Sequence, residues 1–292
     1  MINFNTGKEV LNKYLGSESK ITVVFDDATY MVKFPDPIIS RSSKDILGYK
    51  YNQFSEHIGS NIFRACGFEA QETKLGYYTD SHGNESIVVG CQDFTQGGNT
   101  LYEFAKIANS VTTSLDKHIS SIENVMFIIN ESKFITDKLS ISNRFWDMFV
   151  IDALIGNDDR HFNNWGLLGK GDGSVVFAPI YDCGASLSAM LDDSKMNELL
   201  SSPDDFNMSE LHLRSSYSIG GKRVRYFDIF NAPPEELEKA IKRTIPKIDM
   251  VKINGIIDSV TLLSDIRKEY LKQALYLRCK QILFPAFERI VD

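Results

Sequence analysis

The most informative stretch of this chain is Ile155–Trp165, with the sequence IGNDDRHFNNW. It follows Ser142–Ile155, which is apolar around nearly its whole circumference and therefore predicts a helix buried in the middle of a domain. Downstream, Trp165–Leu168 and Ser174–Phe177 flank a glycine-rich turn and predict a short hairpin. The sequence PIYDCG follows at 179–184. We therefore expect two polar loops to lie beside a buried helix and a hairpin.

The spacing of acids and amides in these loops suits phosphoryl transfer. Such a reaction needs one carboxylate to orient the attacking hydroxyl, and an amide and a second carboxylate to hold metal ions. In protein kinases the first two occur as D-x-x-x-x-N, and the second carboxylate begins D-F-G after a hairpin. Asp159 with Asn164 fits this spacing, as does Asp158 with Asn163, and Asp182 begins D-C-G. Spacing alone leaves both pairs open.

Each of these residues also has a structural interpretation. Asp and Asn in a loop after a helix are most often turn residues. His161 is more often a histidine that orients its loop than a metal ligand beside carboxylates. The loop, the hairpin and the D-x-G sequence together favour catalysis more than any of them does alone.

The first third of the chain predicts strands around one helix. Two β-rich pairs of segments each flank a turn, and the segment between them has helical character and ends before a glycine. The expected strands are Ile21–Phe25, Thr29–Phe34, Glu72–Thr79 and Ser86–Gln92, and the expected helix is Tyr49–Arg64. Residues 1–95 are therefore predicted to form a small β-rich N-lobe.

Helices dominate after Gln96–Asn99, the most linker-like stretch in this half of the chain. Besides the buried helix, the sequence predicts helices at Thr100–Asn109, Leu115–Asn130, Pro234–Arg243 and Asp265–Gln281. Residues 96–292 then form a larger helical C-lobe that carries the catalytic loop. The predicted fold class is α+β, with a bilobal, protein-kinase-like architecture in which a nucleotide lies between the lobes.

A kinase also needs a strand lysine aimed at the phosphates and held by a helix glutamate. Lys33 is the only charge in the apolar run Tyr30–Phe34, and Glu56 lies on the next predicted helix. The alternatives are a lysine extending from an edge strand and a solvated helix face. The Gly/Ser-containing stretch Leu15–Lys20 either brings backbone N–H groups to phosphate or is an ordinary surface loop.

Composition excludes several classes. With 292 residues, 32 Lys+Arg and 39 Asp+Glu, the net charge of −7 argues against non-specific nucleic-acid binding, and we expect no direct DNA contact. The four cysteines form no C-x-x-C, against a zinc ribbon or disulfide scaffold. No secretory signal and no run of about 20 apolar residues is present, so we expect a cytoplasmic protein without a membrane contact, with export as an effector left open.

The blocks DDRHFNN at 158–164 and APIYD at 178–182 resemble the C-terminal kinase domain of the HipA-like proteins. These are bacterial serine/threonine kinases, often toxins of toxin–antitoxin systems, with a fold similar to that of phosphatidylinositol 3/4-kinases. The segments Tyr30–Pro35 and Tyr51–Ser60 resemble the shorter members of the family. The resemblance extends over roughly residues 15–230.

The resemblance resolves the register that spacing left open. It implies that Asp159 is the base, that Asn164 and Asp182 are Mg²⁺ ligands, and that Lys33 contacts the phosphates of ATP. It also implies that Ile87–Cys91 is a hinge strand whose backbone meets adenine. The expected nucleotide-binding residues are then Gly16, Ser17, Ser19, Lys33, Glu56, Val89, Cys91, Asp93 and His161.

The resemblance also has implications for how the enzyme is regulated. A serine in the phosphate-binding loop of such kinases can be autophosphorylated, which ejects the loop and stops the enzyme; the candidates here are Ser17 and Ser19. Only about 14 residues precede the loop, which leaves no room for the N-terminal subdomain of full-length HipA, so an antitoxin partner is an open expectation. Cys183 replaces the Phe of D-F-G, so control by a flipping aromatic does not carry over.

The function expected is ATP-dependent phosphorylation of a serine or threonine in a protein substrate, as a candidate toxin or effector. The alternatives are a phosphoinositide-type lipid kinase, which would want a cationic membrane-facing surface, and a nucleotide-binding pseudokinase or regulatory module. After Asp182, where peptide substrates would lie, the basic run Lys222–Arg225 either meets an acidic or tRNA-bound target or, more often for such a run, forms a solvated hairpin.

Overall fold

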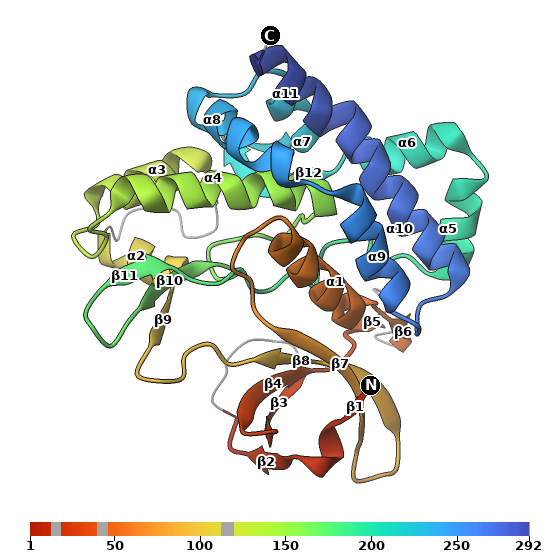
Figure 1. The fold of residues 1–292 in the computed structure, drawn as a ribbon. Helices are drawn as coiled ribbons and strands as arrows, with labels where there is room; N and C mark the ends of the chain where they lie inside the picture. Colours follow the sequence, from red (N-terminus) through yellow and green to blue (C-terminus); the bar gives the residue numbers. More distant parts are fainter. Residues whose placement is uncertain (13–18, 40–45, 112–119, 292) are drawn as a thin grey trace.

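The computed structural model describes residues 1–12, 19–39, 46–111 and 120–291 of the chain, which has a mixed α+β fold (Figure 1). A six-stranded sheet lies at the bottom of the view, and most helices lie above it. The sheet has the order β1-β7-β8-β4-β3-β2, in which β1 and β7 are parallel and the other neighbours are antiparallel. Its strands are β1 (Ile2–Asn3), β2 (Lys8–Val10), β3 (Lys20–Phe25), β4 (Ala28–Lys33), β7 (Thr73–Thr79) and β8 (Glu85–Gln92).

The hairpin of β3 and β4 turns as its sequence predicts. Asp26 and Asp27 have φ angles of 48° and 59°. A two-residue turn with both φ angles positive matches the right-handed twist of the flanking strands, and Asp tolerates this conformation better than most residues. The register that follows places Lys33 opposite Lys20 on one side and Val89 on the other.

Between the two strand pairs the chain forms α1 (Asn52–Ala65), which confirms the predicted helix, and Gly67 after it has a φ of 78°. Ahead of α1, β5 (Pro37–Ile39) and β6 (Ile46–Tyr49) form a separate two-stranded sheet.

The segment after Gln96–Asn99 begins differently from the prediction. Residues 100–109 were expected to be one helix, but Thr100–Glu103 is strand β9 and only then does α2 (Phe104–Val111) begin. β9 pairs with β10 (Gly166–Gly169), which also pairs with β11 (Val175–Phe177) in the predicted hairpin. Pairing with a strand more than sixty residues away thus overrides the local helical preference.

The longest helix is α4 (Lys138–Ile155), whose first residue follows the N-cap Asp137. α3 (Ile122–Glu131) begins at the N-cap Ser121, later than the predicted start at Leu115, which lies outside the described residues. The remaining elements are α5 (Asp193–Leu200), α6 (Pro203–Leu211), β12 (Arg214–Ile219), β13 (Lys222–Arg225), α7 (Tyr226–Asn231), α8 (Glu235–Thr244), α9 (Met250–Ser259), α10 (Asp265–Arg278) and α11 (Phe284–Val291).

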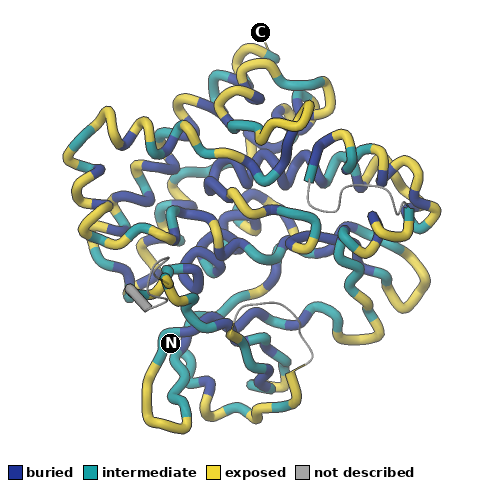
Figure 2. Tube along the Cα trace, turned by 180° about the vertical axis from the view of Figure 1, so that it is seen from behind, coloured by how far each residue is buried: buried dark blue, intermediate teal, exposed yellow. Residues whose placement is uncertain are grey.

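Two hydrophobic clusters hold the molecule together. The larger one surrounds α4, which is buried through its C-terminal two thirds, and the buried segments lie mainly in the middle of the helical part (Figure 2). The smaller one lies in the six-stranded sheet and consists of Phe4, Val23, Tyr30, Val32 and Val88.

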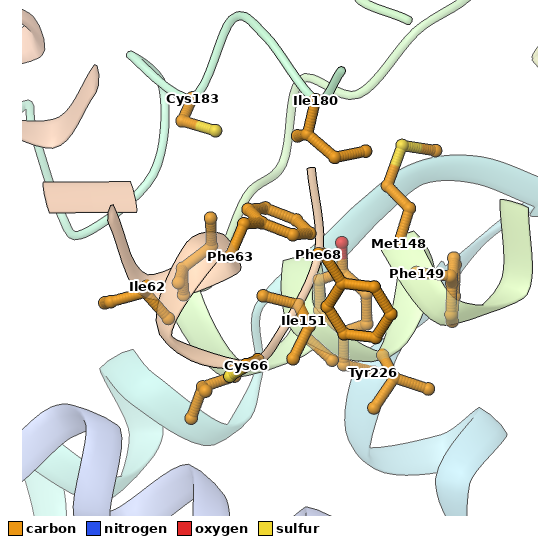
Figure 3. Close-up of a cluster of buried hydrophobic side chains, with 14 of the residues drawn as sticks. Ile62, Phe63, Cys66, Phe68, Met148, Phe149, Ile151, Ile180, Cys183 and Tyr226 are labelled. Carbon is orange, nitrogen blue, oxygen red and sulfur yellow. The ribbon is translucent and has the colours of Figure 1, made fainter. Parts of the chain in front are cut away.

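Helix α1 packs against β7 and β8 of the sheet, and its buried residues belong to the larger cluster. Ile62 and Phe63 of α1 share this cluster with Ile151 of α4 and with Cys183 (Figure 3). The helix that carries Glu56 is therefore packed against the segment that carries Asp182. The predicted division of the chain at residue 95 stays a prediction. No helix within the described residues combines the length and apolar character needed to cross a bilayer.

Candidate active site

Three charged residues from three separate segments meet at the inner end of a cleft. Lys33 of β4 places its Nζ 3.2 Å from Oε2 of Glu56 and 2.8 Å from Oδ1 of Asp182. Lys33 and Glu56 are only 4% and 1% exposed. Because a buried charge is costly without partners, this arrangement excludes the alternatives of an edge lysine reaching into water and of a solvated glutamate. The expected pairing of the strand lysine Lys33 with the helix glutamate Glu56 is therefore confirmed as a contact.

The backbone at Asp182 adopts an unusual conformation. Its φ is 59°, in the left-handed region that non-glycine residues rarely occupy. The next amide, the N–H of Cys183, donates to Oε1 of Glu56 at 3.1 Å. Glu56 thus holds Lys33 with one oxygen and the backbone after Asp182 with the other. Burial raises the pKa of Asp182, but the Lys33 ammonium outweighs it, so this pKa lies below its usual value.

The loop after α4 starts at Gly156, the C-cap of the helix, with a φ of 66°. A Cβ at this position would approach the Arg278 guanidinium and Leu213 within 3 Å, so the site needs glycine for both space and conformation. Asn157 follows and fixes the turn, because its side-chain amide donates to Asp152 at 3.0 Å while its Oδ1 accepts from the N–H of Asp159 at 3.1 Å.

Within this loop the structure joins Asp159 to Asn164. The Nδ2 of Asn164 donates to the Asp159 carbonyl at 2.8 Å and lies 3.4 Å from its Oδ2. Nε2 of His161 lies 3.7 Å from Oδ1 of Asp159. Partial burial, together with the Asp182 carboxylate, raises the pKa of Asp159 against the opposing charges of His161 and Arg160. The side chain of Asp159 is still 54% exposed, so it is accessible to a second substrate.

Arg160 is the residue that sequence analysis missed. Its side chain is buried beneath the loop, where Nε and Nη2 donate to the two carboxylate oxygens of Asp152 at 3.0 and 3.1 Å. Nη1 donates to the carbonyls of Asn164 at 2.8 Å and Asp182 at 3.2 Å, and also to that of Tyr181. Burial lowers the pKa of Arg160, but Asp152 outweighs this and raises it above its usual value. One buried cation thus ties the two polar loops together.

These groups open into a cleft of about 1270 Å³. Glu56, Arg160, Asp152 and Asn157 are buried behind its walls and do not line it. The predicted site residues on its walls are Lys33, Asp93, Asp159, His161, Asn164 and Asp182. Asp93 is buried, and its Oδ1 accepts from the backbone and hydroxyl of Thr95 at 2.8 and 2.6 Å.

The predicted hinge contacts disagree with the sheet order. Val89 and Cys91 lie in β8, between β7 and β4, and both are fully buried. They are paired on both sides, with Leu75 and Lys33 around Val89, and neither lines the cleft. Because the backbone groups of an interior strand are used in the sheet, the sheet order does not favour the expected contact of these two residues with adenine, which stays a prediction. The chain that reaches the cleft begins at Asp93.

The predicted phosphate-binding loop is only partly covered by the structure. Gly16 and Ser17 lie outside the described residues. Ser19 is exposed, and its carbonyl accepts from the N–H of Phe34 at 3.1 Å, while Lys20 after it lines the cleft. The end of this stretch therefore lies beside the strand that carries Lys33.

Comparison with known proteins identifies the relatives of this site. Residues 14–250 match the model of the HipA-like C-terminal domain. The chain belongs to the HipA-like kinase family. Among curated proteins, it is 33% identical over 280 residues to the serine/threonine-protein kinase CtkA of Helicobacter pylori strain J99, covering 94% of this chain and 83% of that protein.

Solved structures agree with this assignment. The crystal structure of a Helicobacter pylori proinflammatory kinase CtkA matches with a TM-score of 0.89 and 31% identity, covering 100% of this chain and 99% of that one. HipA of Shewanella oneidensis MR-1, solved with HipB and operator DNA, matches with a TM-score of 0.57 and 14% identity over 97% of this chain and 68% of that one, and it shares the fold. This HipA-like chain is therefore an enzyme of the protein kinase class.

Proposed function

We propose that this HipA-like kinase transfers the γ-phosphoryl group of ATP to a serine or threonine hydroxyl of a protein. The observation that carries the proposal is that Lys33, Asp159, Asn164 and Asp182, from segments up to 149 residues apart, line one cleft. These are the residue types that a kinase needs for phosphates, acceptor and metal. The family relationship and the names of the relatives support a protein acceptor over a phosphoinositide.

Lys33 would bind the α/β-phosphates. Its ammonium is held from below by Glu56, so it is already desolvated and oriented toward the cleft. In the described structure the same ammonium contacts Asp182. Phosphate oxygens would share this ammonium with Asp182, and the buried Glu56 would keep Lys33 in place as they do so.

The residues present fit a Mg²⁺ site. Asp182 supplies a carboxylate with a lowered pKa, which keeps it ionised at neutral pH. The amide of Asn164 donates through Nδ2 to Asp159, and within the described part of the chain no group donates to its Oδ1, which is therefore available to a cation. Mg²⁺ commonly uses one or two protein oxygens and completes its shell with phosphates and water. Bound there, it would neutralise charge on the β- and γ-phosphates.

Asp159 would accept a hydrogen bond from the acceptor hydroxyl and align it for attack. Its carboxylate is more exposed than those of the other charged groups of the set, so a macromolecular substrate could reach it from solvent. Asn164 and His161 restrict its position, so the alignment is built into the loop before the substrate binds. The hydroxyl proton would pass to this carboxylate as the bond from the hydroxyl oxygen to the γ-phosphorus forms and the bond to the bridging oxygen breaks, so that ADP leaves.

Four further expectations stay predictions. Autophosphorylation at Ser17 or Ser19 stays a prediction, as do a toxin role and an antitoxin partner, because the HipA structure with HipB supports the fold alone. A cytoplasmic location also stays a prediction. A nucleotide-binding regulatory module without turnover is the competing proposal that the following experiment separates.

The test is intact-mass spectrometry of the purified protein and a generic serine/threonine substrate after incubation with Mg·ATP. The variant is Asp159→Asn, and the matched control is Asp158→Asn, which makes the same change at the neighbouring exposed carboxylate. We expect Asp159→Asn to lower phosphate incorporation by about 10²–10⁴-fold, and Asp158→Asn to lower it far less. The opposite order would assign the base to Asp158. ATP binding without any phosphate gain in the wild type would support the regulatory module instead.

A further inference from the structure

The hairpin of β12 and β13 forms part of the cleft wall beside the catalytic loop. Its Ser216 and Arg223 line the same cleft as Asp158 and Asp159. The hairpin is fixed against the start of α3, because the N–H of Ser218 donates to the Ser120 carbonyl at 2.9 Å. The basic run Lys222–Arg225, which we expected to form a solvated hairpin, does lie in a hairpin, and one residue of the run lines the cleft that contains Asp159.

Only one of the three cations of this run faces the cleft. Arg225 is engaged elsewhere, because its Nε and Nη2 donate to the two carboxylate oxygens of Asp228 at 2.6 and 3.0 Å. Lys222 is exposed and does not line the cleft. Arg223 alone points its charge toward the site, which makes it different in role from its neighbours.

The Arg223 guanidinium is held in a fixed place. Its Nη2 donates to the Asp158 carbonyl at 2.9 Å and its Nε donates to the Ser215 carbonyl at 2.9 Å. Both acceptors are backbone carbonyls. Among the described residues no carboxylate lies within ion-pair distance of the guanidinium, and the carboxylates of Asp158 and Asp159 feel its charge only at longer range. The Nη1 amino group therefore has N–H donors left for a ligand. The guanidinium that carries them is hydrogen-bonded to Asp158, which directly precedes Asp159.

The strand paired with that of Arg223 carries buried hydroxyls that lack a hydrogen-bond partner among the described residues, at Ser216, Tyr217 and Ser218. The hydroxyl of Ser216 is buried, and it makes no hydrogen bond to any group that the structure describes. It lies on the cleft wall, on the strand paired with that of Arg223. An oriented cation on the cleft wall, with N–H donors left over, points to a ligand with an anionic acceptor.

We infer that Arg223 recognises an acidic side chain close to the phosphoacceptor in the protein substrate. The inference rests on the proposed function, because Asp159 places the acceptor hydroxyl at the neighbouring residue of the loop. A guanidinium matches a carboxylate in charge and planar geometry. Successive residues of an extended peptide are about 3.3 Å apart, so the acidic residue lies within a few positions of the acceptor. The substrate class is a serine or threonine flanked by Asp or Glu.

The test uses a positional-scanning peptide library with a central Ser/Thr mixture and one fixed Glu, Gln or Lys at each flanking position. We expect the wild type to prefer Glu over Gln by about fivefold in kcat/KM at one position, near the upper limit for a solvent-accessible ion pair. Arg223→Gln should remove that preference, and Arg223→Glu should change it to Lys. The matched control is Lys222→Gln, which removes the same charge one residue away and should keep the preference for Glu.

Each outcome has one meaning. A wild type that phosphorylates the peptides without preferring acids, or an Arg223→Gln variant that retains the preference, would overturn the inference and leave the proposed function standing. A raised KM for ATP in Arg223→Gln, with peptide preference unchanged, would assign Arg223 to the phosphates and also overturn it. Phosphorylation of no peptide by a wild type that binds ATP would contradict the proposed function itself.

Discussion

The ion pair beneath the catalytic loop gives the strongest expected effect of a single substitution. Asp152 and Arg160 have side chains that are each only 1% exposed. The carboxylate accepts two bonds from Arg160 and one from Asn157, at 3.0 to 3.1 Å. Removing one partner of a buried pair strands the other charge, at a cost of about 3–5 kcal/mol. We therefore expect Asp152→Ala to lower the free energy of unfolding by that amount.

The complementary variant, Arg160→Met, has a pH dependence of defined sign. Burial raises the pKa of Asp152 above its usual value, and Arg160 is the group that opposes this. Without Arg160 the folded-state pKa rises further above the unfolded one. The stabilising effect of protonated Asp152 is then fully present below the unfolded pKa and is lost as the pH rises through the folded pKa. The deficit relative to wild type should shrink between pH 7 and pH 5.

Urea unfolding of the two single variants and the double variant, at both pH values, measures these effects. The double variant should be destabilised by less than the sum of the single changes, because neither charge is left unpaired. Additive losses within about 0.5 kcal/mol would refute the coupling. Under conditions where Arg160→Met is fully folded, its kcat should fall more than its KM for ATP rises, because Asn164 and Asp182 lose the shared donor to their carbonyls. An unchanged kcat would show that Arg160 only stabilises the fold.

Two further expectations follow from buried groups. Burial raises the pKa of Cys66, Cys183 and Cys279 to about 12, and Cys91 is also buried. A thiol reagent at pH 8 should therefore label none of the four cysteines in the native protein and all four in denaturant. Fast labelling of any one of them in the native protein would contradict its buried position. Burial also lowers the pKa of His57 from 6.5, so its contribution to stability is present above pH 6.5 and is lost as the pH falls; His57→Gln should flatten this part of the stability profile in urea titrations, and an unchanged profile would exclude the assignment.

The part of the site that could be predicted is the part whose geometry is local. Asp159, Asn164 and Asp182 lie within one loop–hairpin–loop unit, where their spacing indicated a kinase-type site, and the family resemblance then favoured Asp159 over Asp158. Lys33 and Glu56 could be named because a kinase needs a strand lysine held by a helix glutamate, and Lys33 is the only charge in the apolar run Tyr30–Phe34. In the first case the residues lie close together in the sequence. In the second case phosphoryl-transfer chemistry names the residue types that must pair.

The position of the expected hinge residues and the strand β9 could not be predicted from local sequence. Whether Val89 and Cys91 reach the cleft depends on which strands flank β8, and those partners, β4 and β7, are chosen by the whole sheet. Thr100–Glu103 has no strand pattern of its own strong enough to outweigh a helix, and it becomes a strand because β10 offers an edge. Such choices depend on packing between distant segments, which local propensity does not record.

The buried pair beneath the loop is a different case, because the sequence held a usable signal. Asp152 is the one charge within residues 148–155 of α4, and a buried charge in such an apolar segment must find a partner inside the protein. The loop that immediately follows contains one arginine, Arg160. The pair at the other side of this turn gives no such clue, because Glu210 and Arg278, both 1% exposed, are 68 residues apart.

Both pairs act at the same point of the fold. Arg278 donates to the Leu154 carbonyl at 2.9 Å, just before the loop, while Arg160 donates to carbonyls within and beyond it. Hydrophobic contacts cannot fix a polar loop that must face solvent and substrate, whereas directional bonds from a buried guanidinium can. We infer that the cost of burying these charges is offset by the fixed geometry of the loop that carries Asp159. If so, the double variant of Asp152 and Arg160 should keep much of its stability and still lose turnover.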